Sequence, residues 1–488
     1  MLGAVAGGAV AQETTSPYGP VDESSEAMRR IRAAMHHRPD GSHHLLLTSL
    51  RQLRAESLRP LFRQLVQADH WTLQLDGILG LAELDEEPVD PALIERIAAP
   101  AERAAAIRAA ISLDLVGVAE AEEMLRWAAV PPAEQVALLG ELHARGAAIS
   151  PESLAAFAGS EDLQVAAKAA VLLAELGDSA AVDLFASRVD RVTGVAREDA
   201  VVTFARAAEK HLADTAVPTL VRFASASSAT RSERLACLSA LLAADLEVGL
   251  ELWVELFEAT TSNAGRLRTA LLLLASEQPL PPEVLAHLEG HGEVLEALGA
   301  AATAVATGTD RVEAFRRLLA GGHRLSVAWA MTALIGQPPE VAVPIYVAML
   351  ESLIEGRPTA PMMAIEAAAR LSGLDPDALA PLLEAAAERD EALLEALLVG
   401  ILSGTDREAA ARLARGVLGL GGRRCDSLAV LAIARSSEPL SPSEADLLAI
   451  AAAGGGRLDP SLEVQAAWLH LERLDRIPDA LASAAGDP

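Results

Sequence analysis

The chain has 488 residues, more than the roughly 250–300 that a single hydrophobic core organises, so it forms either several domains or an extended array. Hydrophobic residues make up 51% of the sequence and aromatic residues only 3%, which favours close-packed helices over sheets. With 40 basic and 68 acidic residues the net charge is −28, which opposes a phosphate backbone and argues against nucleic acid as a partner.

The N-terminus carries a short segment typical of a secretory signal. Residues 2–11 are uncharged and small, and Ala9, Val10 and Ala11 match a small-x-small cleavage site, although the usual basic region is missing. Ser, Thr, Pro and acidic residues follow, so we expect residues 1–25 to be a partial signal-like segment and a disordered leader. This pattern favours export from a bacterial cell, with a cytoplasmic location as the alternative.

A cluster of histidines follows the leader. His36, His37, His43 and His44 flank a turn that contains Asp40, and imidazole nitrogens are ligands for zinc or copper. The alternative is an exposed polar loop between the first helices. The loop is the favoured interpretation, because a single segment supplies every ligand and no carboxylate is placed to support them. We therefore expect no bound metal, with these four histidines as the candidate ligands.

From about residue 26 onward, apolar residues recur with the 3.6-residue period of amphipathic helices, and no strand pattern interrupts them. Breaks at Gly, Pro, Asp or Ser divide the helices into pairs. The expected ends of the second helices are Asp85, Gly117, Gly146, Gly177, Leu212, Asp245, Ser276, Gly308, Gly336, Gly373 and Gly404. Successive ends are 28 to 37 residues apart, which is typical of stacked helical hairpins.

The clearest repeat lies at residues 162–178. It resembles the short HEAT-like repeat found in phycobilisome lyases, and the positions that match its second helix are Asp162, Val165, Ala169, Ala170, Leu173, Gly177 and Asp178. Ala166 stands where the family usually has Arg. The resemblance covers about residues 45–475 and implies an all-α solenoid of about 12–14 two-helix repeats over residues 26–488.

Arginines recur in the early turns of successive second helices. They are Arg197, Arg231, Arg234, Arg266 and Arg268. Because equivalent positions line up in stacked hairpins, these side chains are candidates for a stripe that binds an acidic peptide or a C-terminal carboxylate. The alternative is pairing within the chain, with Glu198, Glu233, Glu251 and Glu255 as the nearby acids.

The standard catalytic motifs are missing from the sequence. Neither Lys168 nor Lys210 follows a glycine, which excludes a P-loop, and there is no Gly-x-Ser-x-Gly elbow or His-Glu-x-x-His helix. His287 and His291 come closest to a zinc helix, but Gly290 is expected to end the helix between them.

The remaining distinctive side chains are expected to be structural. Cys237 and Cys425 lie in apolar helical stretches and are interpreted as buried hydrophobic residues that do not form a disulfide. The tryptophans are expected to anchor the core at Trp71, Trp127, Trp253, Trp329 and Trp468.

These observations favour a non-catalytic scaffold or adaptor that presents a concave surface to another protein or peptide, without a cofactor. The resemblance implies a first alternative, an enzyme of the lyase class that acts on a tetrapyrrole-bearing partner. A metal-binding module built on the histidine cluster is the second alternative.

Overall fold

The computed structural model describes residues 23–117, 120–121, 130–211, 214–275, 281–321, 323–356 and 361–484. Helices and short turns account for these residues, and no strand occurs among them, so the predicted all-α class is confirmed. The signal-like segment lies outside the described residues. The first helix begins at Glu23, within the last residues of the predicted leader.

The first half of the chain forms short helices joined by tight turns. Their bounds are α1 (Glu23–Ala34), α2 (Ser42–Arg51), α3 (Arg59–Leu65), α4 (Trp71–Asp85), α5 (Pro91–Glu95), α6 (Pro100–Ser112), α8 (Pro132–Ala144), α9 (Pro151–Ala158), α10 (Leu163–Glu175), α11 (Ala180–Val189), α12 (Val195–His211), α13 (Val217–Ser225) and α14 (Arg231–Ala244). Two 3₁₀ turns, η1 (Glu56–Leu58) and η2 (Asp214–Ala216), precede α3 and α13.

The second half continues in the same way. The helices are α15 (Leu246–Ala259), α16 (Asn263–Ala275), α17 (Pro282–Ala286), α18 (Glu293–Thr307), α19 (Arg311–Ala320), α20 (Arg324–Ile335), α21 (Pro339–Ile354), α22 (Pro361–Leu374), α23 (Pro376–Arg389), α24 (Glu391–Ser403), α25 (Arg407–Val417), α26 (Arg423–Ala434), α27 (Pro442–Ala452), α28 (Pro460–Arg473) and α29 (Ile477–Ala484).

Capping residues explain where many helices begin. The Asp162 side chain accepts hydrogen bonds from the first backbone N–H groups of α10, and Thr230 forms a capping box with Glu233 at the start of α14. Ser441 and Glu444 form the same box on α27. Each cap satisfies donors that have no partner inside the helix, so the local sequence sets the boundary.

The predicted ends of the second helices agree closely with the structure. The helices α14, α18, α20 and α24 end at Ala244, Thr307, Ile335 and Ser403, each one residue before the predicted position. The helix α6 ends at Ser112, well before the predicted Gly117. The predicted ends at Leu212 and Ser276 lie outside the described residues.

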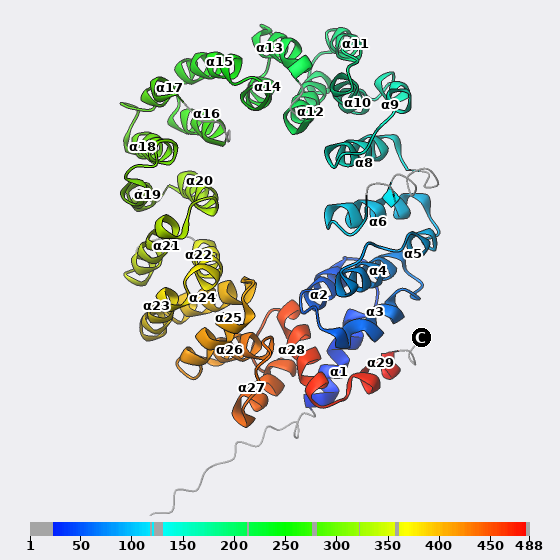
Figure 1. The fold of residues 1–488 in the computed structure, drawn as a ribbon, viewed down its shortest axis with the longest axis vertical. Coiled ribbons are helices and arrows are strands. Elements are labelled where there is room, and N and C mark those ends of the chain that lie inside the picture. The colour runs from blue at the N-terminus through cyan, green and yellow to red at the C-terminus, as the bar shows by residue number, and fades with distance from the viewer. Residues whose placement is uncertain are drawn as a thin grey trace, which may run out of the picture.

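The helices are arranged as a ring in two rows (Figure 1). On the upper part of the ring, α12, α14 and α16 lie on the inner side and α13 and α15 on the outer side. Along the inner row α10 contacts α12, α12 contacts α14, and α14 contacts α16. In the second half of the chain, successive members of the series α22, α24, α26 and α28 also contact one another. The same is true of the series α19, α21, α23 and α25. In these stretches a helix therefore packs on the helix two positions further along the chain.

The core between the rows consists mainly of Ala, Leu and Val, as the composition predicts. Trp253 and Trp468 are fully buried, and Trp71 and Trp329 are partly buried, whereas Trp127 lies outside the described side chains. Small residues permit close approach of the helices: a Cβ added at Gly77 would lie 2.7 Å from the Phe62 carbonyl oxygen. The prediction that tryptophans anchor the core is confirmed at Trp253 and Trp468.

The two ends of the chain pack against each other and close the ring. The helices α1 and α2 contact α28, and α1 also contacts α27 and α29 (Figure 1). One buried cluster contains Leu47 of α2 together with Trp468 of α28. The Gln465 amide nitrogen donates to the Ser49 carbonyl over 2.7 Å, and the Trp468 indole N–H donates to Ser57 Oγ over 3.0 Å. We call this contact the seam; the sequence pattern did not predict it.

A helix able to cross a membrane is absent from the described residues, as expected for the folded part of the chain.

Candidate functional site

Three of the four predicted histidine ligands come together where α2 meets the start of α4, and they are joined by a histidine that was not predicted. His37 stacks on His70 with ring centroids 3.4 Å apart and packs edge-on against His43, which in turn stacks on His44 at 4.4 Å. His36 is exposed and takes no part in these ring contacts. His70 immediately precedes α4, and its distance along the chain hid it from a search for local clusters.

Hydrogen bonds around Thr72 indicate which ring nitrogens of His43 and His70 act as acceptors. The Arg38 backbone N–H donates to His43 Nδ1 over 3.2 Å, so a neutral His43 carries its proton on Nε2 and donates it to Thr72 Oγ1 at 2.8 Å. The Thr72 backbone N–H donates to His70 Nδ1, which also accepts from the Thr72 hydroxyl at 2.8 Å. A chain of hydrogen bonds therefore links Arg38, His43, Thr72 and His70.

Asp76 supplies the carboxylate that the sequence did not place. Its Oδ2 lies 2.7 Å from His44 Nδ1, and its Oδ1 lies 3.5 Å from the Arg51 guanidinium, which also pairs with Glu83 at 2.6 Å. The hydrogen bond to Asp76 raises the pKa of His44, whereas burial and then the neighbouring His44 lower the pKa of His43. The pKa values of the two adjacent imidazoles are thus shifted in opposite directions.

One set of possible ligand atoms from His43, His44 and Asp76 lies within 4.8 Å of one another. Both nitrogens of His43 and the Nδ1 of His44 are already hydrogen-bonded, so a metal ion would have to displace existing bonds. The cluster as folded is a hydrogen-bonded polar network. Metal binding by these histidines is the less favoured alternative to a polar loop, and it remains untested.

The five predicted arginines have different surroundings. Arg197 is buried and bonds to Glu233, which is fully buried, so the alternative of internal pairing holds at this position. Arg231 and Arg234 line a pocket of about 370 Å³ between α14 and α15. Arg268 is exposed and Arg266 partly buried. The structure therefore brings only Arg231 and Arg234 together at a pocket.

The other metal or thiol candidates from the sequence are the pair His287 and His291 and the two cysteines. His287 Nδ1 lies 3.0 Å from Glu258 Oε1, while His291 packs edge-on against Phe257, so the two imidazoles do not converge. Both cysteines are buried and free, as predicted. Burial raises the pKa of Cys237 to about 12 and that of Cys425 to about 11, so neither thiol ionises readily near neutral pH.

Glu391 and Glu395 lie close enough to Cys425 for the three side chains to share a metal ion. Glu395 is already paired with Arg424 at 3.1 Å, and the high pKa of the thiol, which the two carboxylates raise further, disfavours the thiolate that a metal requires. This group therefore gives no strong candidate for a metal centre.

A large groove lies where α17, α18 and α19 meet, with the start of α20 at its edge. Its volume is about 1390 Å³, well above the ~300–1,000 Å³ of typical small-molecule pockets. Small residues of α18, such as Gly299, Ala300 and Thr303, line it together with Leu285 and Leu318. Because these side chains of α18 are short, they do not fill the volume between the helices, and the groove remains open.

The rim of this groove is acidic. Five of its lining residues are exposed carboxylates: Glu289, Glu293, Glu296, Asp310 and Glu313. Arg317 is the only Lys or Arg among the lining residues. Of the five, Glu296 accepts a hydrogen bond from the Gly290 backbone N–H.

A buried hydroxyl group marks the edge of the groove. Ser326, in the first turn of α20, lines the groove, is fully buried, and its Oγ has no hydrogen-bond partner. Buried hydroxyls usually find a partner, because an unsatisfied one costs about 1–3 kcal/mol. The groove thus combines an apolar floor, an acidic rim and one polar group that lacks a partner.

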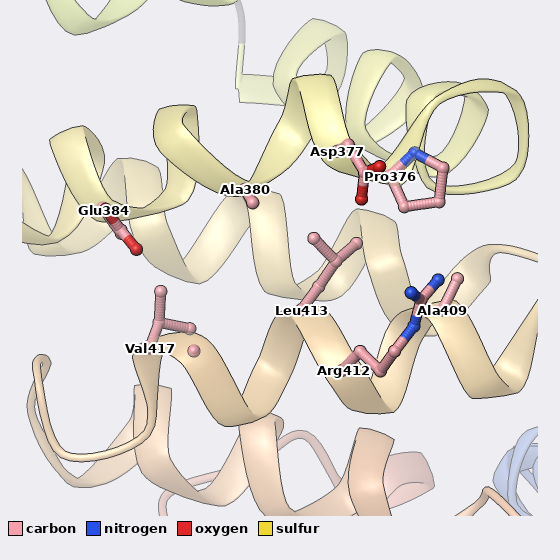
Figure 2. Close-up of a pocket in the computed structure, with 9 residues that line it drawn as sticks. Pro376, Asp377, Ala380, Glu384, Ala409, Arg412, Leu413 and Val417 are labelled. Atoms are coloured by element: carbon pink, nitrogen blue, oxygen red, sulfur yellow. The ribbon is translucent and has the colours of Figure 1, made fainter.

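The pocket shown in Figure 2 is much smaller, at about 130 Å³. It lies between α23 and α25, with Asp377 and Glu384 on one side and Arg412 and Leu413 on the other (Figure 2). Its volume is below that of typical ligand pockets, and its charged groups do not converge on one point. We therefore regard the acidic groove as the better candidate.

The fold and these surfaces define an all-α ring with an acidic groove and a polar histidine network. No protein-family model, no curated protein and no solved structure matches this chain. Its function must therefore be argued from its own residues.

Proposed function

We propose that this chain is a HEAT-like α-solenoid of about 12–14 two-helix repeats that acts as a non-catalytic scaffold and binds a basic amphipathic helix of another protein in the acidic groove. The single observation that carries the proposal is the groove itself, with an apolar floor below five exposed carboxylates.

The chemistry of the groove favours a helical peptide with lysine or arginine along one face. An amphipathic helix buries its apolar stripe in a hydrophobic groove, and its basic face meets the acidic rim. The net charge of −28 adds a long-range attraction for such a segment. An acidic peptide, by contrast, would face repulsion from Glu289, Glu293 and Glu313.

The lyase alternative has less support from this groove. A bilin carries propionate carboxylates, and the acidic rim would repel them. Incubation of the purified protein with a bilin, followed by absorbance spectroscopy, distinguishes the two: a stable coloured adduct would favour the lyase.

The proposal can be tested with a labelled basic amphipathic model peptide and fluorescence anisotropy. Replacement of Glu289, Glu293 and Glu313 by Gln should weaken binding about tenfold, because each lost charge contributes about 0.5 kcal/mol. The matched control replaces three exposed acids of α15, Glu247→Gln, Glu251→Gln and Glu255→Gln. Equal weakening in the two triple variants would mean that the attraction is general and would overturn the assignment to the groove.

A further inference from the structure

A second cavity, of about 530 Å³, lies at the seam and has the opposite charge. Its walls come from both ends of the chain: Gln52 and Arg54 follow α2, Arg407 lies on α25, Arg435 follows α26 and Gln465 lies on α28. The lining residues include no Asp or Glu. Three arginines thus surround one cavity in a chain whose net charge is −28.

The acidic residues on either side of Arg407 in the sequence, Asp406 and Glu408, are hydrogen-bonded to other groups of the protein. The Asp406 side chain caps α25 by accepting from the Ala409 N–H, and Glu408 accepts from Ser437. Burial and then the neighbouring Arg407 lower the pKa of Arg435 to about 10, and no acidic group contributes to this shift. The arginines therefore repel one another without a counter-ion from the described residues.

The guanidinium groups have few partners in the protein. Arg435 donates to the Leu402 carbonyl at 2.7 Å and its Nε is buried without a partner, while Arg407 donates to the Gln52 carbonyl at 3.0 Å. Arg54 is exposed and is held in a left-handed backbone conformation with φ 47°. Several N–H donors thus remain for an anion.

Gln465 provides an independent sign of a missing ligand. This residue is 1% exposed and its amide nitrogen donates to the Ser49 carbonyl, which can only accept, so the orientation of the amide is settled. Its Oε1 is buried with no hydrogen-bond partner, and the residue lines the cavity. A buried acceptor without a donor is stabilised by a hydroxyl group of a ligand or by an ordered water molecule.

We propose that the seam cavity binds a small phosphorylated ligand that also carries hydroxyl groups, such as a sugar phosphate. The phosphoryl oxygens would pair with Arg54, Arg407 and Arg435, because guanidinium groups match the geometry of phosphate. A ligand hydroxyl would donate to Gln465 Oε1. A simple carboxylate supplies no such donor at neutral pH, which is why a phosphorylated polyol fits better.

Because both ends of the chain form the walls, this cavity is complete only when the ring is closed. A ligand that binds only the closed form stabilises that form by mass action. The ligand would therefore stabilise the seam and the closed ring. This inference is independent of the acidic groove, which is formed by other helices, α17 to α19 and the start of α20.

Isothermal titration calorimetry of the full chain with inorganic phosphate and with a hexose monophosphate tests the site. We expect the hexose phosphate to bind more tightly, and Arg54→Gln to weaken its binding by roughly tenfold. The matched control is Arg63→Gln, another exposed arginine of the N-terminal segment that does not line the cavity. Undetectable binding to the wild type, or equal affinity in the two variants, would overturn the proposal.

A second measurement tests the coupling between ligand binding and ring closure without the Arg54→Gln variant. In a variant with a weakened seam, Trp468→Ala, small-angle X-ray scattering should show a larger radius of gyration that falls again when hexose phosphate is added. Binding with no change in the radius of gyration would contradict the coupling to ring closure.

Discussion

Arg197 on α12 and Glu233 on α14 form an ion pair that is almost fully buried, and Glu233 also completes the capping box of α14. Removing one partner of a buried pair leaves an uncompensated charge in a medium that solvates it poorly. Breaking this pair is therefore expected to destabilise the contact between α12 and α14.

We predict that Glu233→Ala lowers the local stability of α12 and α14 by about 3–5 kcal/mol. Hydrogen exchange of the amides in these two helices measures the loss. The double variant Arg197→Met with Glu233→Met should recover part of it, because no buried charge remains. If the double variant loses as much as the sum of the two single changes, the pair does not act as a unit.

The histidine network gives the N-terminal helices a pH-dependent stability. Burial, and then the neighbouring His44, lowers the pKa of His43 below the ordinary histidine value of about 6.5. Burial and then His37 lower the pKa of His70. The unfolded chain then binds more protons than the folded chain just below pH 6.5, so the stability is complete above this pH and is lost as the pH falls through the window beneath it.

His44 works in the opposite direction. Asp76 raises its pKa, so its contribution is complete below pH 6.5 and is lost as the pH rises through the folded-state pKa. We expect the buried His43 and the stacked His70 to dominate. The hydrogen-exchange protection factors of α2 and α4, which correct for the slower intrinsic exchange at low pH, should then fall as the pH is lowered from about 7.5 to about 5.5. His43→Asn keeps an acceptor for the Arg38 N–H but does not titrate, and it should reduce this change. An unchanged pH dependence in that variant would contradict the assignment.

At the scale of the helix, glycine and alanine determine how closely neighbouring elements pack. Gly400 on α24 faces α22, and a Cβ added there would lie 2.7 Å from Ala368 Cβ. Gly416 on α25 has nothing within 4 Å of the equivalent position. Gly400 is therefore needed for the close contact between α22 and α24. Gly416 has no such packing role and only lowers the helix propensity of α25.

We predict that Gly400→Ala destabilises the α22–α24 contact by about 1–3 kcal/mol through overpacking. Gly416→Ala should instead stabilise α25 by up to about 1 kcal/mol, because alanine is the better helix former. Thermal unfolding followed by circular dichroism compares the two variants. The same sign of change in both would show that helix propensity, and not packing, governs these positions.

At the scale of the whole molecule, the seam turns a linear succession of helices into a ring (Figure 1). Elsewhere a helix packs on near neighbours in sequence, but at the seam α1 and α2 meet α28 across almost the full length of the chain. A contact of this kind brings a large loop-closure cost and must be stabilised by well-packed groups such as the buried Trp468.

We predict that Trp468→Ala weakens the seam by about 3–5 kcal/mol and opens a fraction of the rings. Small-angle X-ray scattering should then show an increased radius of gyration while the helix content stays close to that of the wild type. Trp253→Ala is the matched control, since this tryptophan is equally buried but lies on α15, away from the seam. An equal increase in both variants would indicate general loosening and not opening of the seam.

The sequence by itself determined the helices, because capping side chains, glycines and the apolar period act over a few neighbouring residues. The Asp162 cap, the Thr230 box and the helix ends at Ala244 and Ser403 are examples. It also indicated His37, His43 and His44, which lie close together in sequence in the loop before α2 and at the start of α2.

Only the tertiary structure decided which distant residues share a site. His70 and Asp76 joined the histidines through the packing of α4 on α2, and Arg54, Arg407 and Arg435 met because the ring closed. The acidic groove likewise needed the mutual placement of α17, α18 and α19. Such contacts depend on side-chain packing between elements far apart in the chain, for which a local pattern of residues carries no signal.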